Sequence, residues 1–511
     1  MTAEANIDRD DLAIGIVGAG AMGRGIAQVA AEAGFAVRLY DVSLEAVGSA
    51  LKTIATMVDR AAAKGRITAQ DAAHIRSRVT VTDTLSDLAP CHVVIEAIVE
   101  DLDAKQTLMR ALEAIVADDC LIASNTSSLS ITAIAAACRL PARVAGMHFF
   151  NPVPLMRVVE VVGGLRTAPE TTEALVRLAG RFGHRPVRVA DSPGFLVNHA
   201  GRGLITEGLR IVQEGVATPH DVDRVMREAA GFRMGPFELF DLTGLDVSAP
   251  ILDLIYAQFY QEPRFRPTPL PRLRVAAGLY GRKSGEGFYR YPDGRQEQPP
   301  EPVPPTLPDR PPVWVSAADA ARRAPVIDLL AGVGAEIDDG AEPHRDSLCL
   351  VTPLGADATT TAIEQGLDAE RTMAVDTLFD LAGRRTLMAT IVTADRYRAA
   401  AHALFAGAGG KVTVIRDSTG FIAQRVVATI VNIACEIAQQ RIAAPDDIDA
   451  AVTLGLGYPE GPLALGDRLG GLVIHAILRT LHDMTGDPRY RPSPWLSRRA
   501  ALGASLRTPE A

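Results

Sequence analysis

The stretch Ala13-Ile-Gly-Ile-Val-Gly-Ala-Gly-Ala-Met-Gly23 decides the fold of the N-terminal part of this 511-residue chain. It has the pattern of a short apolar strand, a glycine turn and the beginning of an alanine-rich helix. A second strand-like run ends just before Asp41. Such glycines let a pyrophosphate approach the N-terminus of the helix, and a carboxylate at this place accepts hydrogen bonds from a ribose. The stretch therefore predicts a dinucleotide-binding turn, with contacts from Gly18, Gly20, Ala21, Met22 and Gly23.

The charge of Asp41 predicts which dinucleotide is bound. A carboxylate at the ribose favours NAD, because the 2'-phosphate of NADP would meet its negative charge. Arg24 and Arg38 are close in the sequence and keep NADP open as an alternative. A turn of purely structural glycines is the other alternative, since a lone fingerprint is weak evidence.

Strand-like runs continue along the first part of the chain at residues 36–40, 93–97, 121–124 and 144–150, with helical patterns between them. Alternation of strand and helix is typical of a parallel, doubly wound sheet. We therefore predict an α/β domain of the Rossmann type over residues 1–190.

A histidine and a carboxylate flank a predicted turn near the end of this domain. His148 closes the apolar run 144–150, Glu160 lies in the run 157–162, and Asn151-Pro-Val-Pro154 separates the two. If the runs pair as a hairpin, the imidazole and the carboxylate face each other as a general base and its orienting group. A buried histidine with a structural role is the alternative. The pair predicts proton abstraction beside the bound dinucleotide.

Three other polar residues are candidates with ordinary alternatives. Ser127 belongs to the run Ser124-Asn-Thr-Ser-Ser128, at the carboxyl end of a predicted strand, where open α/β sheets bind ligands. Ser127 is equally typical of a helix cap, and Asn198 of a turn or cap. Lys64 lies in a basic region after Asp41, and such charges are usually solvated surface.

The remainder of the chain is organised as a duplication. Long helical patterns predict an all-α domain over residues 191–295, followed by a proline-rich linker at 296–312. The sequence Asp191-Ser-Pro-Gly-Phe195 recurs as Asp417-Ser-Thr-Gly-Phe421, an offset of 226 positions that is kept through the helical part. We predict a second copy of the helical domain at 411–511.

Residues 313–410 occupy the place of the Rossmann domain in the second copy and predict a shortened, degenerate α/β domain without the glycine fingerprint. In place of the His148 hairpin we align residues 386–395, which contain no histidine, and Asn198 is matched by Gln424. The second half is therefore predicted to be non-catalytic.

Composition excludes several functional classes. The net charge of -9 argues against a nucleic-acid partner, and no apolar run is long enough to predict a membrane span. The five cysteines are scattered without a close pair, so neither a disulfide framework nor a metal site is predicted. We expect a reduced, cytoplasmic protein.

These motifs together strongly resemble the NAD-dependent 3-hydroxyacyl-CoA dehydrogenases. The resemblance covers residues 12–292 and includes the spacing between motifs. It is carried by Gly18-Ala-Gly-Ala-Met-Gly23, Glu96-Ala-Ile-Val-Glu100, Ser124-Asn-Thr-Ser-Ser128, His148-Phe-Phe-Asn-Pro-Val-Pro154, Asp191-Ser-Pro-Gly-Phe-Leu-Val-Asn198 and Gly285-Glu-Gly-Phe-Tyr289. The degenerate second half further resembles the long form of the family found in phenylacetate catabolism, which is thought to oxidise 3-hydroxyadipyl-CoA.

The resemblance implies roles for single residues. It makes His148 the catalytic base and Glu160 its orienting partner, with Ser127 and Asn198 contacting the reacting oxygen of the substrate. The implied NAD contacts are Asp41, Glu100, Lys105, Ser127, Asn151 and Lys283. Lys64 matches a contact to coenzyme A. Met57 and His199 depart from the family, which usually has a serine and an arginine there.

The implied activity is oxidation of an L-3-hydroxyacyl-CoA to a 3-ketoacyl-CoA with NAD as the only cofactor, and with 3-hydroxyadipyl-CoA or 3-hydroxybutyryl-CoA as the expected substrate. Two alternatives stay open: a dehydrogenase of a free 3-hydroxy acid, of the gulonate type, and a non-catalytic NAD- or CoA-binding structural protein. Two-domain members of the family pair through their helical domains, so the two helical copies are expected to pair within one chain. A further homo-oligomer stays open.

Overall fold

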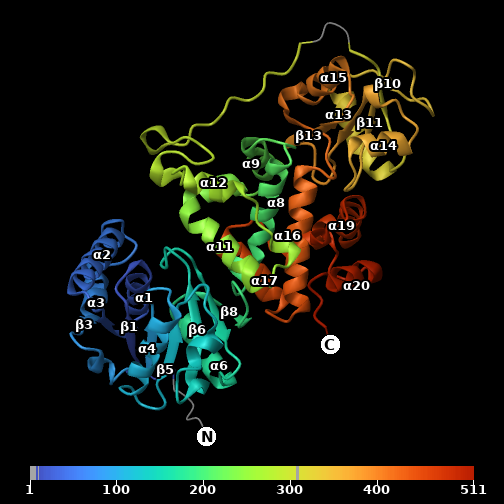
Figure 1. Ribbon diagram of the computed structural model, residues 1–511. Coiled ribbons are helices and arrows are strands. Elements are labelled where there is room, and N and C mark those ends of the chain that lie inside the picture. The colour runs from blue at the N-terminus through green and yellow to red at the C-terminus, as the bar shows by residue number, and fades with distance from the viewer. Residues whose placement is uncertain (1–6, 10, 307–309, 511) are drawn as a thin grey trace. The chain divides into compact units, whose positions relative to one another are not determined.

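The computed structural model describes residues 7–9, 11–306 and 310–510, so residues 307–309 of the predicted linker lie outside it. Contacts divide the chain into two compact units, each built from separated stretches of sequence (Figure 1). The first unit contains residues 1–199 and 440–456. The second contains residues 200–439 and 457–511.

The first unit is built on a sheet in the strand order β3-β2-β1-β4-β5-β6-β7-β8. Neighbouring strands are parallel except for the antiparallel pair β6–β7. The strands are β1 (Ala13–Val17), β2 (Ala36–Tyr40), β3 (Val79–Val81), β4 (Val93–Glu96), β5 (Leu121–Ser124), β6 (Val144–Phe149), β7 (Val158–Gly163) and β8 (Arg185–Ala190). This arrangement confirms the predicted Rossmann-type domain.

Helices pack on the faces of this sheet. Successive side chains of a strand point to opposite faces, so every second residue contacts the helices on one face. The helices are α1 (Ala21–Glu32), α2 (Leu44–Ala63), α3 (Ala69–Ser77), α4 (Leu102–Glu113), α5 (Ile131–Ala135), α6 (Pro169–Arg181) and α7 (Val197–Ala200). One core joins apolar residues of α1, α2, α3 and α6 to every second residue of the strands, such as Ile14 and Ile16. Ser43 and Asp101 begin α2 and α4 by accepting hydrogen bonds from backbone N–H groups of the first turn.

The second unit contains the duplicated helices. The first set is α8 (Arg202–Gln213), α9 (Pro219–Glu228), α10 (Pro236–Thr243), α11 (Leu245–Gln258) and α12 (Leu270–Ala276). The second set in this unit is α16 (Ile422–Gln439), α18 (Pro462–Leu469), α19 (Gly471–Thr485) and α20 (Pro494–Leu502). The bounds of α18 repeat those of α10 after the predicted offset of 226 residues.

The two helical copies pair through α8 and α16, as predicted. The backbones approach so closely that a Cβ at Gly203 would lie 2.9 Å from Cα of Ile430. Beside this contact the buried carboxylate of Glu207 pairs with Arg425 at 2.7 Å and with Arg489 at 3.4 Å. A buried charge is costly unless an opposite charge lies beside it. Glu207 of the first copy must therefore meet Arg425 and Arg489 of the second, which fixes the register of the two copies.

The second sheet also lies in this unit and has the order β10-β9-β11-β12-β13-β14. Its strands are β9 (Val313–Val315), β10 (Ile337–Asp338), β11 (Leu348–Val351), β12 (Thr372–Val375), β13 (Arg384–Ala389) and β14 (Lys411–Ile415), with helices α13 (Ala320–Gly332), α14 (Ala358–Glu364) and α15 (Asp395–Phe405). The predicted boundary at residue 410 is therefore wrong by one strand. The run 411–415 pairs in parallel with β13 and completes the sheet, since its apolar side chains are buried there.

The counterpart of the His148 hairpin in the second half also needs correction. The antiparallel pair of this sheet is β12–β13, so residues 386–395 do not form the hairpin by themselves, and its first strand begins at Thr372. In strand register, Asp376 occupies the place of His148 and Thr386 the place of Glu160. The prediction failed because β12 contains only three apolar residues, Met373 to Val375, and gives a weaker pattern than the run 386–395.

The residues at this place form a closed hydrogen-bonded cluster. The side chain of Gln424 accepts a bond from the Gly355 N–H at 2.8 Å and donates to the Pro353 carbonyl at 3.1 Å and to Asp376 at 3.0 Å. Burial raises the pKa of Asp376 to about 6. With its amide and carboxyl groups already paired, this cluster supports the prediction that the second half is non-catalytic.

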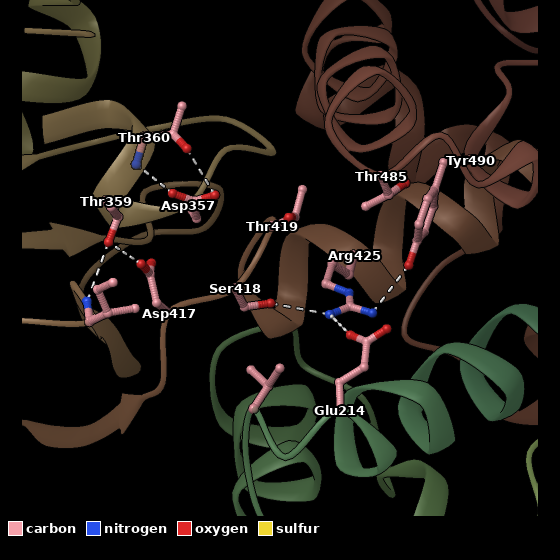
Figure 2. A pocket seen from close by; sticks show the side chains of 12 residues that line it. Glu214, Asp357, Thr359, Thr360, Asp417, Ser418, Thr419, Arg425, Thr485 and Tyr490 are labelled. Carbon is pink, nitrogen blue, oxygen red and sulfur yellow. Dashed lines mark hydrogen bonds and ion pairs between the residues drawn. The ribbon is translucent and has the colours of Figure 1, made fainter. Parts of the chain in front are cut away.

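A pocket of about 440 Å³ lies near this cluster, between loops of the second sheet and the helices (Figure 2). Asp417 accepts hydrogen bonds from Thr359 and from the Ala358 N–H. Arg425, which also lines the pocket, is held by Glu214 at 2.8 Å and by the hydroxyl of Tyr490 at 3.1 Å. The charge of this arginine is therefore neutralised by the protein itself.

One helix of the second copy does not join the second unit. Helix α17 (Pro445–Leu456) packs against β7 and β8 of the first sheet. The predicted domain 411–511 is therefore not one compact body, because its α17 belongs to the first unit. Sequence repetition gives the boundaries of a copy and does not indicate which sheet each helix covers.

No helix among the described residues is long and apolar enough to cross a membrane. Within the same residues, no group of three or more His, Cys, Asp and Glu side chains is placed to hold a metal ion.

Candidate active site

The glycine turn is shaped by contacts that no larger residue would allow. Gly18 has a φ of 104°, and its N–H donates to the Tyr40 carbonyl at 2.8 Å. A Cβ at Gly23 would lie 1.8 Å from the Gly18 oxygen, whereas a Cβ at Gly20 would meet no atom within 4 Å. The backbone at Gly20 is thus open to a ligand at the N-terminus of α1, which is where the pyrophosphate of a dinucleotide binds.

Asp41 stands at the end of β2 beside this turn. Its carboxylate accepts hydrogen bonds from the N–H groups of Ala19 at 2.7 Å and Ser43 at 2.9 Å. These two bonds fix the carboxylate next to the open backbone of Gly20. The acceptor and the open turn fit the ribose and pyrophosphate of NAD.

A second carboxylate, Glu100, organises the loop that follows β5. One of its oxygens accepts bonds from the Thr126 hydroxyl at 2.7 Å and from the N–H groups of Ser127 and Ser128, both at 2.9 Å. Burial raises the pKa of Glu100, but these bonds and the charge of Lys105 outweigh it, so its pKa lies below the usual value. Glu100 therefore remains ionised and holds the loop that carries Ser127.

Lys105 lies beneath Glu100 and is almost fully buried, with 1% of its side chain exposed. Its ammonium pairs with the buried Glu96 and lies 3.4 Å from Glu100. Glu96 also accepts a bond from the Ser124 hydroxyl at 2.6 Å. The contact of Lys105 with NAD stays a prediction. The burial of the Lys105 side chain indicates an indirect role in which the ammonium group supports Glu100. Sequence reasoning missed Glu96, although a carboxylate inside an apolar strand is itself a signal of a buried charge network.

His148 and Glu160 form the predicted pair. They are directly opposite in the antiparallel register of β6 and β7, and His148 Nδ1 lies 2.5 Å from Glu160 Oε2. Glu160 is fully buried, and its other oxygen accepts bonds from the N–H groups of Leu196 at 2.9 Å and Val197 at 2.7 Å. Because a carboxylate only accepts, Nδ1 of the imidazole carries the proton and Nε2 is left to accept one.

The surroundings of the pair are apolar on the imidazole side. The ring of His148 lies 4.4 Å from that of Phe150 and 5.8 Å from that of Phe195, measured between centroids. Only 5% of His148 is exposed. A base that is shielded from water and oriented by a carboxylate is suited to abstracting a proton from a bound substrate.

The other predicted residues of the first unit lie around this pair. Ser127 follows β5, the strand beside β6, and Asn198 follows Val197 directly in α7. Asn151 is exposed in the turn between β6 and β7, where the Asn151–Pro152 bond is cis. The fold thus places Ser127 and His148 at the carboxyl ends of the neighbouring strands β5 and β6. Asn198 comes near the pair because the preceding Leu196 and Val197 donate their N–H groups to Glu160. The contacts of these residues with ligands stay predictions.

Lys64 and Met57 lie toward the end of α2, and Lys283 lies elsewhere. Met57 lines a cleft of about 620 Å³ between α1, α2, α3 and the loop before β7, and Lys64 is exposed just beyond Ala63. The cleft also contains basic side chains. These are Arg66, His74, Arg78 and Arg157. Lys283 belongs to the second unit and pairs there with Asp246 at 2.5 Å, so its contact with NAD stays a prediction.

Comparison with known proteins adds independent evidence. Residues 13–192 match the family model "3-hydroxyacyl-CoA dehydrogenase, NAD binding domain", and residues 194–291 and 420–509 both match the corresponding C-terminal domain. The second match confirms the predicted duplication of the helical domain.

Named relatives cover either the whole chain or its first half. The chain is 37% identical to 3-hydroxyadipyl-CoA dehydrogenase of Escherichia coli over 96% of its length and 97% of the relative. It is 43% identical to a probable 3-hydroxybutyryl-CoA dehydrogenase of Bacillus subtilis over 54% of its length and 96% of the relative.

A solved structure matches the complete fold. The crystal structure of 3-hydroxybutyryl-CoA dehydrogenase from Escherichia coli K12 is 35% identical, covers 96% of this chain and 98% of its own, and superimposes with a TM-score of 0.83. The glycine turn with Asp41, the His148–Glu160 pair and these matches agree on one assignment. The chain belongs to the 3-hydroxyacyl-CoA dehydrogenases, a family of NAD-dependent oxidoreductases.

Proposed function

We propose that His148 is the base that removes the hydroxyl proton of an L-3-hydroxyacyl-CoA while Glu160 holds its imidazole. The single observation that supports this most directly is the 2.5 Å contact between His148 Nδ1 and Glu160 Oε2, which directs Nε2 toward the substrate. NAD, held by the glycine turn and Asp41, supplies the acceptor for the hydride of C3. Ser127 and Asn198 donate hydrogen bonds to the reacting oxygen in this proposal.

When His148 takes the proton, its imidazole becomes positively charged. Because His148 is buried, a nearby negative charge must compensate it. Glu160 carries the negative charge for it and is prevented from moving by the two backbone N–H groups whose hydrogen bonds it accepts. This arrangement stabilises the imidazolium without rearrangement during the reaction. The product is a 3-ketoacyl-CoA.

We propose coenzyme A as the carrier of the acyl group, bound along α2. The exposed Lys64 and the cleft lined by Met57 support this, because that cleft contains three arginines and two acidic side chains, Glu32 and Asp71. An excess of cations suits the phosphates of the nucleotide part of coenzyme A. A free 3-hydroxy acid, the alternative substrate, has no phosphate and would not use this cleft.

Replacing Lys64 tests the coenzyme A proposal. For Lys64→Ala we expect KM for acetoacetyl-CoA to rise roughly two- to fivefold at unchanged kcat, since an exposed charge contributes little but measurably. The acetoacetyl thioester of N-acetylcysteamine lacks the nucleotide and should be reduced equally by both proteins. Lys52→Ala, at an exposed position of α2, is the control. Equal effects of Lys64→Ala on both substrates would contradict the contact.

For the acyl group we propose 3-hydroxyadipyl, in phenylacetate catabolism. The support is the relative of this name, which matches the chain along 96% of its length. The competing group is 3-hydroxybutyryl, because the full-length solved structure has that name. A cytoplasmic location and a further homo-oligomer also stay predictions.

Comparison of two substrates tests the acyl group. We expect kcat/KM for 3-hydroxyadipyl-CoA to exceed that for 3-hydroxybutyryl-CoA by about tenfold or more, the effect of one well-formed ion pair with the distal carboxylate. Production of NADH, followed by its absorbance, measures both. A higher value for 3-hydroxybutyryl-CoA would overturn the adipyl proposal and retain the enzyme class, whereas activity with neither thioester would favour the non-catalytic alternative.

A further inference from the structure

The segment 440–456 of the second half lies against the edge of the catalytic sheet. β8 is the last strand of this sheet and pairs with β7 alone among the described strands. The Ala190 N–H donates to the Ile442 carbonyl at 2.8 Å. Asp447 accepts bonds from the Arg188 N–H and from the Arg185 guanidinium, both at 3.2 Å. The segment thus satisfies backbone groups of an edge strand that would otherwise be open.

Beyond this edge, α17 packs on the residues that hold Glu160. A Cβ at Gly455 would lie 3.1 Å from both methyl carbons of Val197 and 3.5 Å from a methyl of Val158. Val197 donates its N–H to Glu160 at 2.7 Å, and Val158 is two residues before Glu160 on the same face of β7. Gly455 therefore gives α17 close contact with both supports of the Glu160 carboxylate.

We propose that α17 is a positioning element of the active site: the non-catalytic second half supports Glu160, and through it His148, by packing on Val197 and Val158. This inference rests on the proposed roles of His148 and Glu160. A displacement of Val197 moves an N–H donor of Glu160, and the carboxylate contacts His148 directly. Small displacements of a catalytic group reduce turnover strongly, because reacting atoms must be aligned.

The two copies exchange equivalent helices: α17 of the second copy packs on the first sheet, and α9 of the first copy packs on the second sheet. This reciprocity indicates that each sheet needs a helix from the other copy. Within the second unit, α9 of the first copy packs on β13, and the Arg416 N–H donates to the Val216 carbonyl at 3.2 Å, as Ala190 does to Ile442. The sheet that α9 covers has Thr386 in the place of Glu160. Only the α17 side of the exchange therefore has a catalytic pair to support.

The variant Gly455→Val in the full-length protein tests this proposal. Its side chain pushes on Val197, so we expect kcat to fall roughly 10- to 100-fold while KM for NADH stays within about twofold. Adding Val197→Ala makes room for the new side chain, and the double variant Gly455→Val/Val197→Ala should regain most of the lost kcat. Gly180→Val is the matched control, because Gly180 is an exposed position at the same place near the end of α6, with no atom within 4 Å of its Cβ.

The outcomes separate this inference from the proposed function. Unchanged kcat for Gly455→Val, or a loss that Val197→Ala does not relieve, would overturn the positioning role. If His148→Gln loses activity and Gly455→Val does not, only the inference about α17 fails. If Gly455→Val is insoluble, Gly455→Ala introduces the Cβ alone and should show a smaller loss of kcat in the same direction.

Discussion

The variant His148→Gln should lose about 1,000-fold in kcat for oxidation of 3-hydroxyacyl-CoA, because a positioned general base contributes on the order of 100- to 10,000-fold. Glutamine fills a similar volume and donates to Glu160, but its amide does not accept a proton at neutral pH. NADH should bind normally, since the glycine turn and Asp41 are separate from His148. Stopped assays of turnover and a fluorescence titration with NADH measure the two effects independently.

A matched control makes this result specific to the base. His482→Gln changes a half-exposed histidine of α19 and should leave kcat nearly unchanged. Turnover of His148→Gln close to that of the unchanged protein would show that another group takes the proton. A parallel loss of NADH binding would instead indicate that the substitution disturbs the sheet.

The variant Glu160→Gln should lower kcat roughly 100- to 1,000-fold, because it disturbs the tautomer of His148. Glu160 accepts from His148 with one oxygen and from Leu196 and Val197 with the other. An amide has a single acceptor oxygen, so the amino group of the introduced side chain must face either the imidazole or the two backbone N–H groups. Orientation of a catalytic histidine by a carboxylate has effects of this size or larger in other hydrogen-bonded triads.

The free energy of unfolding should also fall for Glu160→Gln, since a buried donor loses its acceptor, at a cost of about 1–3 kcal/mol. Urea denaturation measures this loss. Glu160→Asp, which keeps the charge and shortens the side chain, should retain more activity than Glu160→Gln. Glu45→Gln, at an exposed position of α2, is the control and should change neither quantity. Equal activity of Glu160→Gln and the unchanged protein would exclude the orienting role.

Much of the first half could be predicted from the sequence because its signals are local. The glycine turn requires a φ of 104° at Gly18 and close packing at Gly23, and residues other than glycine would not fit. The His148–Glu160 pair follows from period-two alternation in two strands joined by a short turn, which places both side chains on one face. Similarly, the offset of 226 residues predicted the helical copies before any fold was known.

The predictions that failed concern contacts between distant segments. The counterpart of the hairpin was misplaced because β12 contains only three apolar residues, Met373 to Val375. The boundary at 410 was misplaced because β14, as long as β1 and β2, was assigned to the helical copy. The ion pair of Lys105 with the buried Glu96 was not predicted, because it depends on how α4 packs on the sheet, and the contact of Lys105 with NAD stays a prediction. These features arise from packing between distant segments, which the local periodicity of a sequence does not report.

The sequence by itself determined the dinucleotide-binding turn, the pairing of His148 with Glu160, the duplication and the family, because each depends on residue types at fixed local spacing. Only the tertiary structure decided that the amide of Gln424 and the carboxyl of Asp376 bond to each other in the second copy and that α17 of that copy packs behind Glu160. The physical reason is that a helix must cover the apolar face of the sheet. The equivalent helices of the two copies, α9 and α17, are both suited to this, so local sequence does not decide between them. Which copy supplies the helix depends on contacts between residues 259 positions apart along the chain, such as Arg188 and Asp447.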